Sequence, residues 1–137
     1  MMPYERLTAW QAAHELALAI YKTTDAFPTT ERYGLTSQLR RASFSVAANI
    51  AEGVAKRGNG ELRRFLDISI GSLSEISYAL RLAKDLAILT EEDSNRLDAL
   101  HSKAAKLTWG LYKSVRTRGT TRSRASPSDH PTIRPSD

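Results

Sequence analysis

The sequence contains no cysteine, which excludes a disulfide framework, a thiolate zinc site and a cysteine nucleophile. It also has no apolar run close to the ~18 residues that a membrane-spanning helix needs. The N-terminal segment is interrupted by His14, Glu15 and Lys22, so it lacks the apolar region of a signal peptide. We therefore expect a cytoplasmic protein without a membrane partner.

Proline is absent between Thr29 and Ser126, and no segment shows the alternation of apolar and polar residues that marks a β-strand. Instead, apolar residues recur every three or four positions over four segments, at about residues 7–27, 35–56, 59–89 and 90–111. Four amphipathic helices with short connections predict an all-α fold, an antiparallel up-down-up-down four-helix bundle.

The spacing also predicts which residues face the core and where two of the helices begin. The expected core face of the first helix consists of Trp10, Ala13, Ala17, Ile20, Tyr21, Thr24 and Phe27. That of the second consists of Leu35, Leu39, Ala42, Val46, Ile50 and Gly53. Asn59 is placed to cap the third helix, and Thr90, followed by three acidic residues, to cap the fourth.

The chain has a net charge of +5, and that charge is concentrated towards its C-terminus. Residues 116–137 carry five arginines against two aspartates, a net of +3. Residues 117–137 are also rich in Ser, Thr and Pro and lack an apolar period. We expect a bundle domain over residues 1–116 and a disordered basic tail over residues 117–137.

The second helix carries an additional apolar face, about 120° from its core face on a helical projection. This face and a weaker one on the third helix comprise Phe44, Ala47, Ala48, Ala51, Tyr78 and Leu82. One bundle buries one face of each helix, and the bulky Phe44 beside small alanines favours a subunit interface. The alternative is a wide core face on which small alanines are tolerated.

Several segments together resemble the "four helix bundle protein" family, whose members are also described as proteins of intervening sequences in bacterial large-subunit ribosomal RNA genes. They are Leu7-Thr8-Ala9-Trp10-Gln11-Ala12-Ala13, Glu15-Leu16-Ala17, Phe27-Pro28, Glu31-Arg32-Tyr33-Gly34-Leu35, Ser37-Gln38-Leu39-Arg40-Arg41-Ala42, Asn49-Ile50-Ala51-Glu52-Gly53, Arg64-Phe65-Leu66 and Gly71-Ser72-Leu73-Ser74-Glu75. The resemblance covers residues 4–90, and the fourth helix matches only as a pattern.

This resemblance implies the same bundle, assembled into a ring-shaped homopentamer. It extends in fold to the accessory variability proteins of diversity-generating retroelements, which bind nucleic acid and a reverse transcriptase through a basic surface. By that analogy, the expected partners are further copies of the chain, RNA or DNA, and a protein such as a reverse transcriptase.

Basic residues on the second and third helices are the candidate nucleic-acid-binding residues: Arg40, Arg41, Lys56, Arg57, Arg63 and Arg64. Four of them flank one connection and therefore crowd one end of the bundle, where converging cations favour phosphate binding. The alternative is that they are solvated or paired with Glu52, Glu61 and Asp67. No helix offers a polar face suited to reading bases, so we expect little sequence specificity.

Polar residues between the apolar faces, Asn49, Glu52 and Glu75, are expected to form a structural hydrogen-bond network rather than a catalytic carboxylate pair. Gly53 and Gly71 would then allow close helix approach. A di-iron site needs two inward Glu-x-x-His motifs, and the chain offers only Asp98-x-x-His101, so we expect no metal and no cofactor.

The sequence thus predicts a non-enzymatic homo-oligomer whose basic surface binds RNA or DNA. The alternative is a structural or adaptor oligomer that binds a protein partner without nucleic acid.

Overall fold

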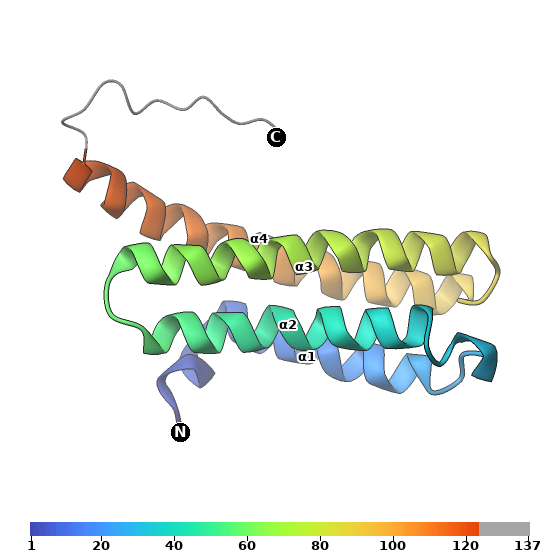
Figure 1. Ribbon diagram of the computed structural model, residues 1–137. Coiled ribbons are helices and arrows are strands. Elements are labelled where there is room, and N and C mark those ends of the chain that lie inside the picture. Colours follow the sequence, from blue (N-terminus) through green and yellow to red (C-terminus); the bar gives the residue numbers. More distant parts are fainter. Residues whose placement is uncertain (124–137) are drawn as a thin grey trace.

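The computed structural model describes the backbone of residues 1–123 and the side chains of residues 1–115. Its four long helices are α1 (Thr8–Thr24), α2 (Leu35–Ala55), α3 (Asn59–Asp85) and α4 (Glu91–Ser123), shown in Figure 1. Two short 3₁₀ turns, η1 (Pro3–Arg6) and η2 (Thr29–Glu31), precede α1 and α2. No strand occurs among residues 1–123, so the expected all-α class with four helices is confirmed.

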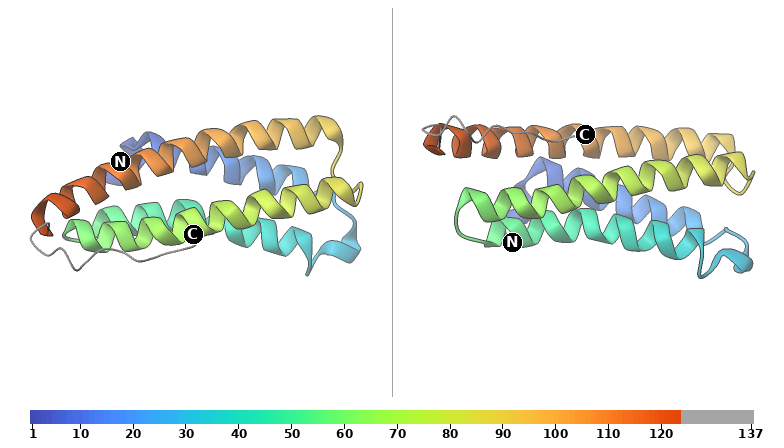
Figure 2. Two further views of the ribbon diagram at one scale, coloured as in Figure 1. Left: turned by 90° about the horizontal axis from the view of Figure 1, so that it is seen from above. Right: turned by 45° about the horizontal axis from the view of Figure 1, so that its top comes forward.

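The helices form a closed square in which each packs against its two neighbours, in the order α1, α2, α3, α4 and back to α1. Neighbouring helices are antiparallel, because residues late in one helix contact residues early in the next. Ser69 on α3 donates a hydrogen bond to the Val46 carbonyl on α2 at 2.9 Å, and Arg96 on α4 bonds Thr23 on α1 at 3.0 Å. Figure 2 shows the four helices running along one common axis.

The predicted core face of α2 is confirmed, and that of α1 is confirmed in part. All six residues expected on α2 are buried. Of the residues expected for the first helix, Ala13, Ile20, Thr24 and Phe27 are buried, and Ala9, Ala12 and Leu16 are buried in addition. Tyr21 is 45% exposed and Trp10 and Ala17 are only half-buried, so the buried face of α1 is turned away from these three residues.

Three helix starts are set by side chains or glycine. The Glu31 carboxylate accepts the backbone N–H of Leu35 at 3.0 Å at the start of α2. Thr90 caps α4 as expected, since its hydroxyl accepts the N–H of Asp93 at 3.1 Å. The expected Asn59 cap was wrong, because α3 follows Gly58, whose φ of +87° only glycine adopts easily.

The end of α3 is a Schellman motif with alanine in place of the usual glycine. The Ile88 N–H bonds the Ala83 carbonyl and the Ala87 N–H bonds the Lys84 carbonyl, both at 2.9 Å. Ala87 therefore lies in the left-handed region, with φ of +61°. This conformation costs an L-residue about 1 kcal/mol.

Ala87→Gly is therefore expected to raise the free energy of unfolding by about 1 kcal/mol, because glycine adopts positive φ without a Cβ clash. Urea unfolding at fixed protein concentration measures the change. Ala99→Gly, at an exposed position inside α4, is the matched control and should lower stability by a similar amount. If both variants lose stability equally, the left-handed conformation of Ala87 is not the cause.

Helix α4 continues to Ser123, past the domain boundary expected at residue 116. Its last turns extend beyond the α2–α3 end of the bundle (Figures 1 and 2). The backbone of residues 117–123 is thus helical, and no proline interrupts the chain before Pro127. The remaining expected tail, residues 124–137, lies outside the described residues.

Candidate functional site: an apolar groove and a basic end

An apolar groove of about 480 Å³ runs along the outside of the bundle between α1 and α2. On its α2 side lie Phe44, Ala47, Ala48 and Ala51, the four residues of that helix expected at a subunit interface. The structure thus brings these four together at one surface. The alanines are half-buried, whereas Phe44 is 66% exposed and reaches away from the core.

The other side of the groove is built from aromatic and aliphatic side chains of η1 and α1. Trp10 stacks on the His14 ring with centroids 4.8 Å apart, and Tyr4 meets Trp10 edge-on at 5.0 Å. Leu18 is 60% exposed beside them. Trp10 is half-buried and also packs against the core, so this wall of the groove is anchored in the bundle.

The two remaining interface candidates, on α3, do not join this groove. Tyr78 is 66% exposed, and Leu82 is half-buried against the core. Neither lines the groove between α1 and α2. The molecule therefore has an exposed aromatic on a second helix, separate from the groove.

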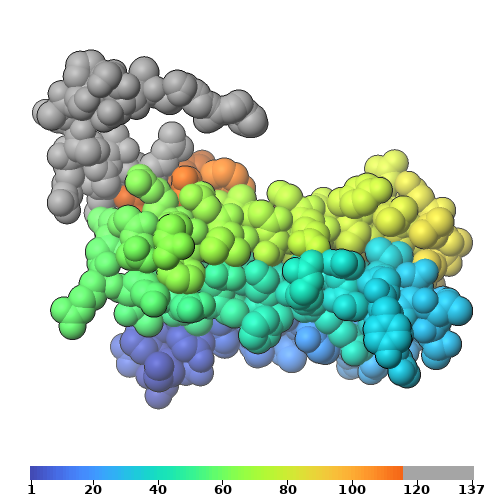
Figure 3. All heavy atoms as spheres, in the orientation of Figure 1, coloured from blue at the N-terminus to red at the C-terminus, as the bar shows by residue number. Residues whose placement is uncertain are grey.

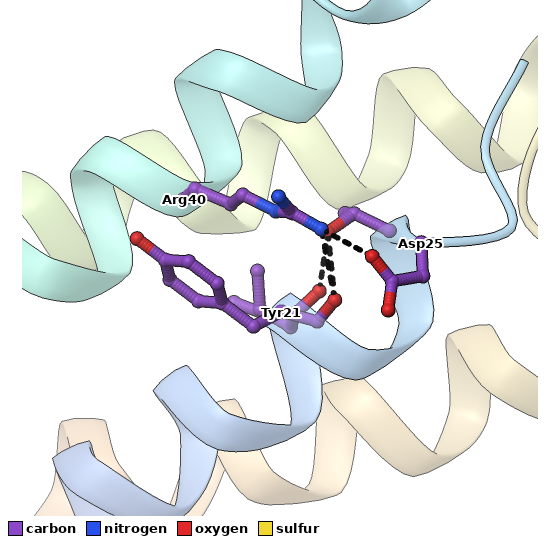
Figure 4. Close-up of polar contacts among 5 residues, drawn as sticks. Tyr21, Asp25 and Arg40 are labelled. Carbon is purple, nitrogen blue, oxygen red and sulfur yellow. Dashed lines mark hydrogen bonds and ion pairs between the residues drawn. The ribbon is translucent and has the colours of Figure 1, made fainter. Parts of the chain in front are cut away.

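Arg40, a candidate phosphate ligand, ties α2 to the C-terminal end of α1 (Figure 4). Its guanidinium donates to the Tyr21 carbonyl at 3.1 Å, to the Thr24 hydroxyl at 2.9 Å and to the Asp25 carboxylate at 2.9 Å. It also lies over the Tyr21 ring, 4.8 Å from the centroid. These contacts fix Arg40 within the bundle and neutralise its charge.

Arg41 and Glu75 form an ion pair between α2 and α3 at 2.7 Å. Arg41 also donates to the Gln38 side chain at 2.5 Å. Glu75 therefore belongs to this pair and not to a network with Asn49. Asn49 instead donates to the backbone and hydroxyl oxygens of Ser45, at 2.9 and 3.0 Å.

Ser45 continues the Asn49 network across to α3, because its hydroxyl is 2.8 Å from that of Ser72. Glu52 is exposed and makes no hydrogen bond or ion pair with any described residue. The three residues expected to share one network are thus separated. Asn49 alone has the inter-helix role, through two serines that the sequence analysis did not single out for it.

The other four candidate cations gather at the end of the bundle where α2 connects to α3, here called the basic end: Lys56, Arg57, Arg63 and Arg64. Lys56, at the end of α2, lies about 24 Å along that helix from Arg40, at roughly 1.5 Å per residue. Green side chains of this connection project beyond the helices in Figure 3. The sequence prediction therefore divides into two clusters at different places.

Contacts within the basic end leave much of its charge free. Arg64 pairs with Glu61 at 3.0 Å, and both side chains stay well exposed. Lys56 and Arg64 flank the Phe65 ring, at 5.5 and 5.1 Å from its centroid. Lys56, Arg57 and Arg63 have no carboxylate partner among residues 1–115. Exposed ion pairs such as Arg64–Glu61 contribute little stability and can be exchanged for a phosphate.

The described side chains form no group of three potential metal ligands. None of the described helices has the length and apolar composition required to span a bilayer. The expected close approach at Gly53 is confirmed, since an added Cβ would lie 2.9 Å from the Phe65 Cβ. That at Gly71 is wrong, because no atom would lie within 4 Å.

A second pocket, polar and about 420 Å³ in volume, lies between α3 and α4 near their connection. Its walls carry Arg81 and Lys84 from α3, and Asp98 and His101 from α4. Asp98 and His101 had been considered only as metal ligands, and the pocket itself was not predicted. Its residues come from two helices and show no local motif.

Comparison with known proteins identifies both fold and family. The crystal structure of a protein of unknown function from the S23 ribosomal protein family of Bacteroides thetaiotaomicron VPI-5482 superposes with a TM-score of 0.69 at 21% identity, over 77% of this chain and 99% of that chain. That likeness shows the fold.

No curated protein matches the chain. The model of the 23S rRNA-intervening sequence protein family matches residues 5–110, which include most of α4 as well as the segments that first suggested a resemblance. The chain belongs to this family.

Proposed function

We propose that this chain is a non-enzymatic, homo-oligomeric bundle protein whose basic end binds the phosphate backbone of RNA or DNA with little sequence preference. The observation that carries the proposal is the cluster of cations around the α2–α3 connection, in which Lys56, Arg57 and Arg64 are exposed and Arg63 is half-buried. Three of them lack a carboxylate partner among the described side chains. Converging, weakly partnered cations are what phosphate binding by counterion release requires.

The proposed surface is smaller than the six residues expected from the sequence. Arg40 and Arg41 are engaged by carboxylates, and Arg40 by α1 carbonyl and hydroxyl groups as well. The backbone of α4 also passes this end of the bundle (Figure 1), and the sequence of that segment contains Arg116, Arg118 and Arg122. The family name, which refers to intervening sequences of 23S rRNA, is consistent with an RNA partner.

In a homo-oligomer, each subunit would contribute its own basic end to the nucleic-acid-binding surface. The proposed subunit interface is the α1–α2 groove, and its occupant is a second copy of the chain. The exposed Tyr78 on α3 lies outside the groove, and two different apolar surfaces on one subunit suit a head-to-tail ring. The number five comes from the family resemblance.

The alternative, an adaptor that binds a protein partner without nucleic acid, is favoured by one observation. The groove is lined by three aromatic rings of α1 and η1 together with Phe44, and aromatics are enriched where proteins bind proteins. A reverse transcriptase is the partner class suggested by analogy. Salt dependence separates the two functions, because counterion release makes nucleic-acid binding fall steeply with salt.

A salt titration of RNA, single-stranded DNA and duplex DNA binding tests the basic end. Arg57→Gln with Arg63→Gln removes two unpaired cations and should reduce the slope of log K against log salt by about 1.5, at roughly 0.7–0.9 per phosphate contact. Fluorescence anisotropy of labelled oligonucleotides measures the slope. Affinity should fall similarly for all sequences tested.

The matched control is Lys22→Gln with Arg32→Gln, which removes the same charge from exposed positions at the far end of the bundle. If both double variants lower the slope equally, binding follows net charge and not the basic end. If the wild type shows no salt-sensitive binding at physiological ionic strength, the adaptor function replaces the nucleic-acid function.

A further inference from the structure

The polar pocket between α3 and α4 is lined by a hydroxyl group that has no partner among the described residues. Ser94 is 2% exposed and lines this pocket. Its hydroxyl makes no hydrogen bond with any described residue, although its backbone N–H bonds the Thr90 carbonyl at 2.8 Å. This hydroxyl is not sealed from solvent, so it is available to donate a hydrogen bond to a ligand in the pocket.

The register of the two helices places a cationic half and an acceptor half along the pocket. His101 bonds the Leu73 carbonyl at 2.7 Å, so α4 and α3 are antiparallel from that point towards their connection. Ser94 therefore lies opposite Arg81 and Lys84, and Asp98 lies opposite Ser77. Along α4, Ser94 and Asp98 are about one helical turn, or 5.4 Å, apart, and so are Ser77 and Arg81 along α3.

The cationic half keeps donors free for a ligand. Arg81 uses only its Nε to bond Asp85, at 2.9 Å, which leaves the two Nη groups available. Lys84 is exposed and has no ion-pair partner among residues 1–115. Together with the Ser94 hydroxyl, these groups offer several donors to one anionic group.

The acceptor half suits hydroxyl groups. A carbonyl oxygen only accepts, so the His101 Nε2 carries the proton in its bond to Leu73. In the neutral ring, Nδ1 is then an acceptor, and the exposed Asp98 carboxylate is a second one. The serines at positions 77 and 102 both donate and accept beside them.

From this arrangement we infer that the α3–α4 pocket binds a small phosphorylated polyol or sugar. Its phosphate is held by Arg81, Lys84 and Ser94, and its hydroxyls bond Asp98 and His101. No aromatic ring lines the pocket, so a nucleobase has no surface on which to stack. The volume of about 420 Å³ holds more than a phosphate ion alone. The site lies at the opposite end of α3 from the basic end and is independent of nucleic-acid binding.

Calorimetric titration of the full chain with glycerol 3-phosphate, inorganic phosphate and glycerol at constant ionic strength tests this site. We expect saturable binding of glycerol 3-phosphate that is at least several-fold tighter than that of inorganic phosphate, with none for glycerol. The ring protons of His101 should shift in NMR spectra during the same titration. Equal binding of the two phosphates, or no binding of either at millimolar concentration, overturns the assignment.

Substitutions locate the site. Lys84→Gln should weaken glycerol 3-phosphate binding about tenfold, and Ser94→Ala about fivefold, as expected for lost hydrogen bonds to an anion. Lys22→Gln, an exposed position on α1, should change it less than twofold. Circular dichroism and thermal melting check that each variant is folded. Binding that is unaffected by both pocket variants overturns the proposal. The same holds if short single-stranded RNA shifts the His101 signals while glycerol 3-phosphate does not.

Discussion

Phe44→Asp is expected to separate the proposed oligomer into folded monomers. Within one subunit the Phe44 side chain is 66% exposed, so an aspartate there disturbs no core contact. At an interface the same change removes an aromatic ring and buries an unpaired charge, which costs about 3–5 kcal/mol. The association constant should therefore fall by a factor on the order of 10²–10³ for each interface. Multi-angle light scattering measures the mass, and circular dichroism confirms retained helicity.

Tyr33→Asp is the matched control, because Tyr33 is 87% exposed in the turn before α2 and does not line the groove. It should leave the oligomer intact. A wild-type protein that is monomeric at tens of micromolar contradicts the proposed assembly. If Phe44→Asp keeps the wild-type mass, the α1–α2 groove is not the interface.

The contrast between α1 and α2 explains how much of the fold the sequence could predict. On α2, the core positions hold large aliphatic residues such as Leu39 and Ile50, whereas the second apolar face is mostly alanine, so periodicity identifies the core face correctly. On α1, Trp10 and Tyr21 lie at the edge of the buried face, and counting them as core turns the predicted face towards them. Periodicity there predicts the helix, and its exact rotation is decided by packing against α2 and α4.

The same limit applies to the candidate site. The gathering of Lys56 and Arg63 at one end follows from the short connection at Gly58, so local sequence was enough to predict it. The hydrogen bonds of Arg40 were not predictable from the sequence. Its partners Tyr21 and Asp25 lie in and just after another helix, and their positions depend on the rotation of α1. Ser94 and Arg81 likewise come together only through the register of α3 against α4.

Gly53 marks the place where α2 and α3 approach most tightly among the glycine positions of the bundle. A Cβ there would lie 2.9 Å from the Phe65 Cβ and 3.0 Å from the Leu62 Cδ1. Gly53 is itself buried, so a larger side chain has no route to solvent without moving a helix. Since closely packed interiors tolerate little added volume, the two helices must separate at this end.

Gly53→Leu is accordingly expected to lower the free energy of unfolding by about 3 kcal/mol, at the upper end of overpacking costs. Gly71→Ala on α3 is the opposite case: no atom lies within 4 Å of the new Cβ, and alanine favours a helix over glycine by about 1 kcal/mol. It should therefore stabilise the protein by that amount.

Urea unfolding at one fixed protein concentration compares the two, because the proposed assembly would make stability depend on concentration. Equal effects of the two substitutions would mean that helix propensity, and not the contact with Phe65 and Leu62, governs Gly53. If Gly53→Leu lowers the free energy of unfolding and Gly71→Ala raises it, the close contact of α2 with α3 at Gly53 is what stabilises this end of the bundle. Gly53 lies immediately before the connection that carries Lys56 and Arg57.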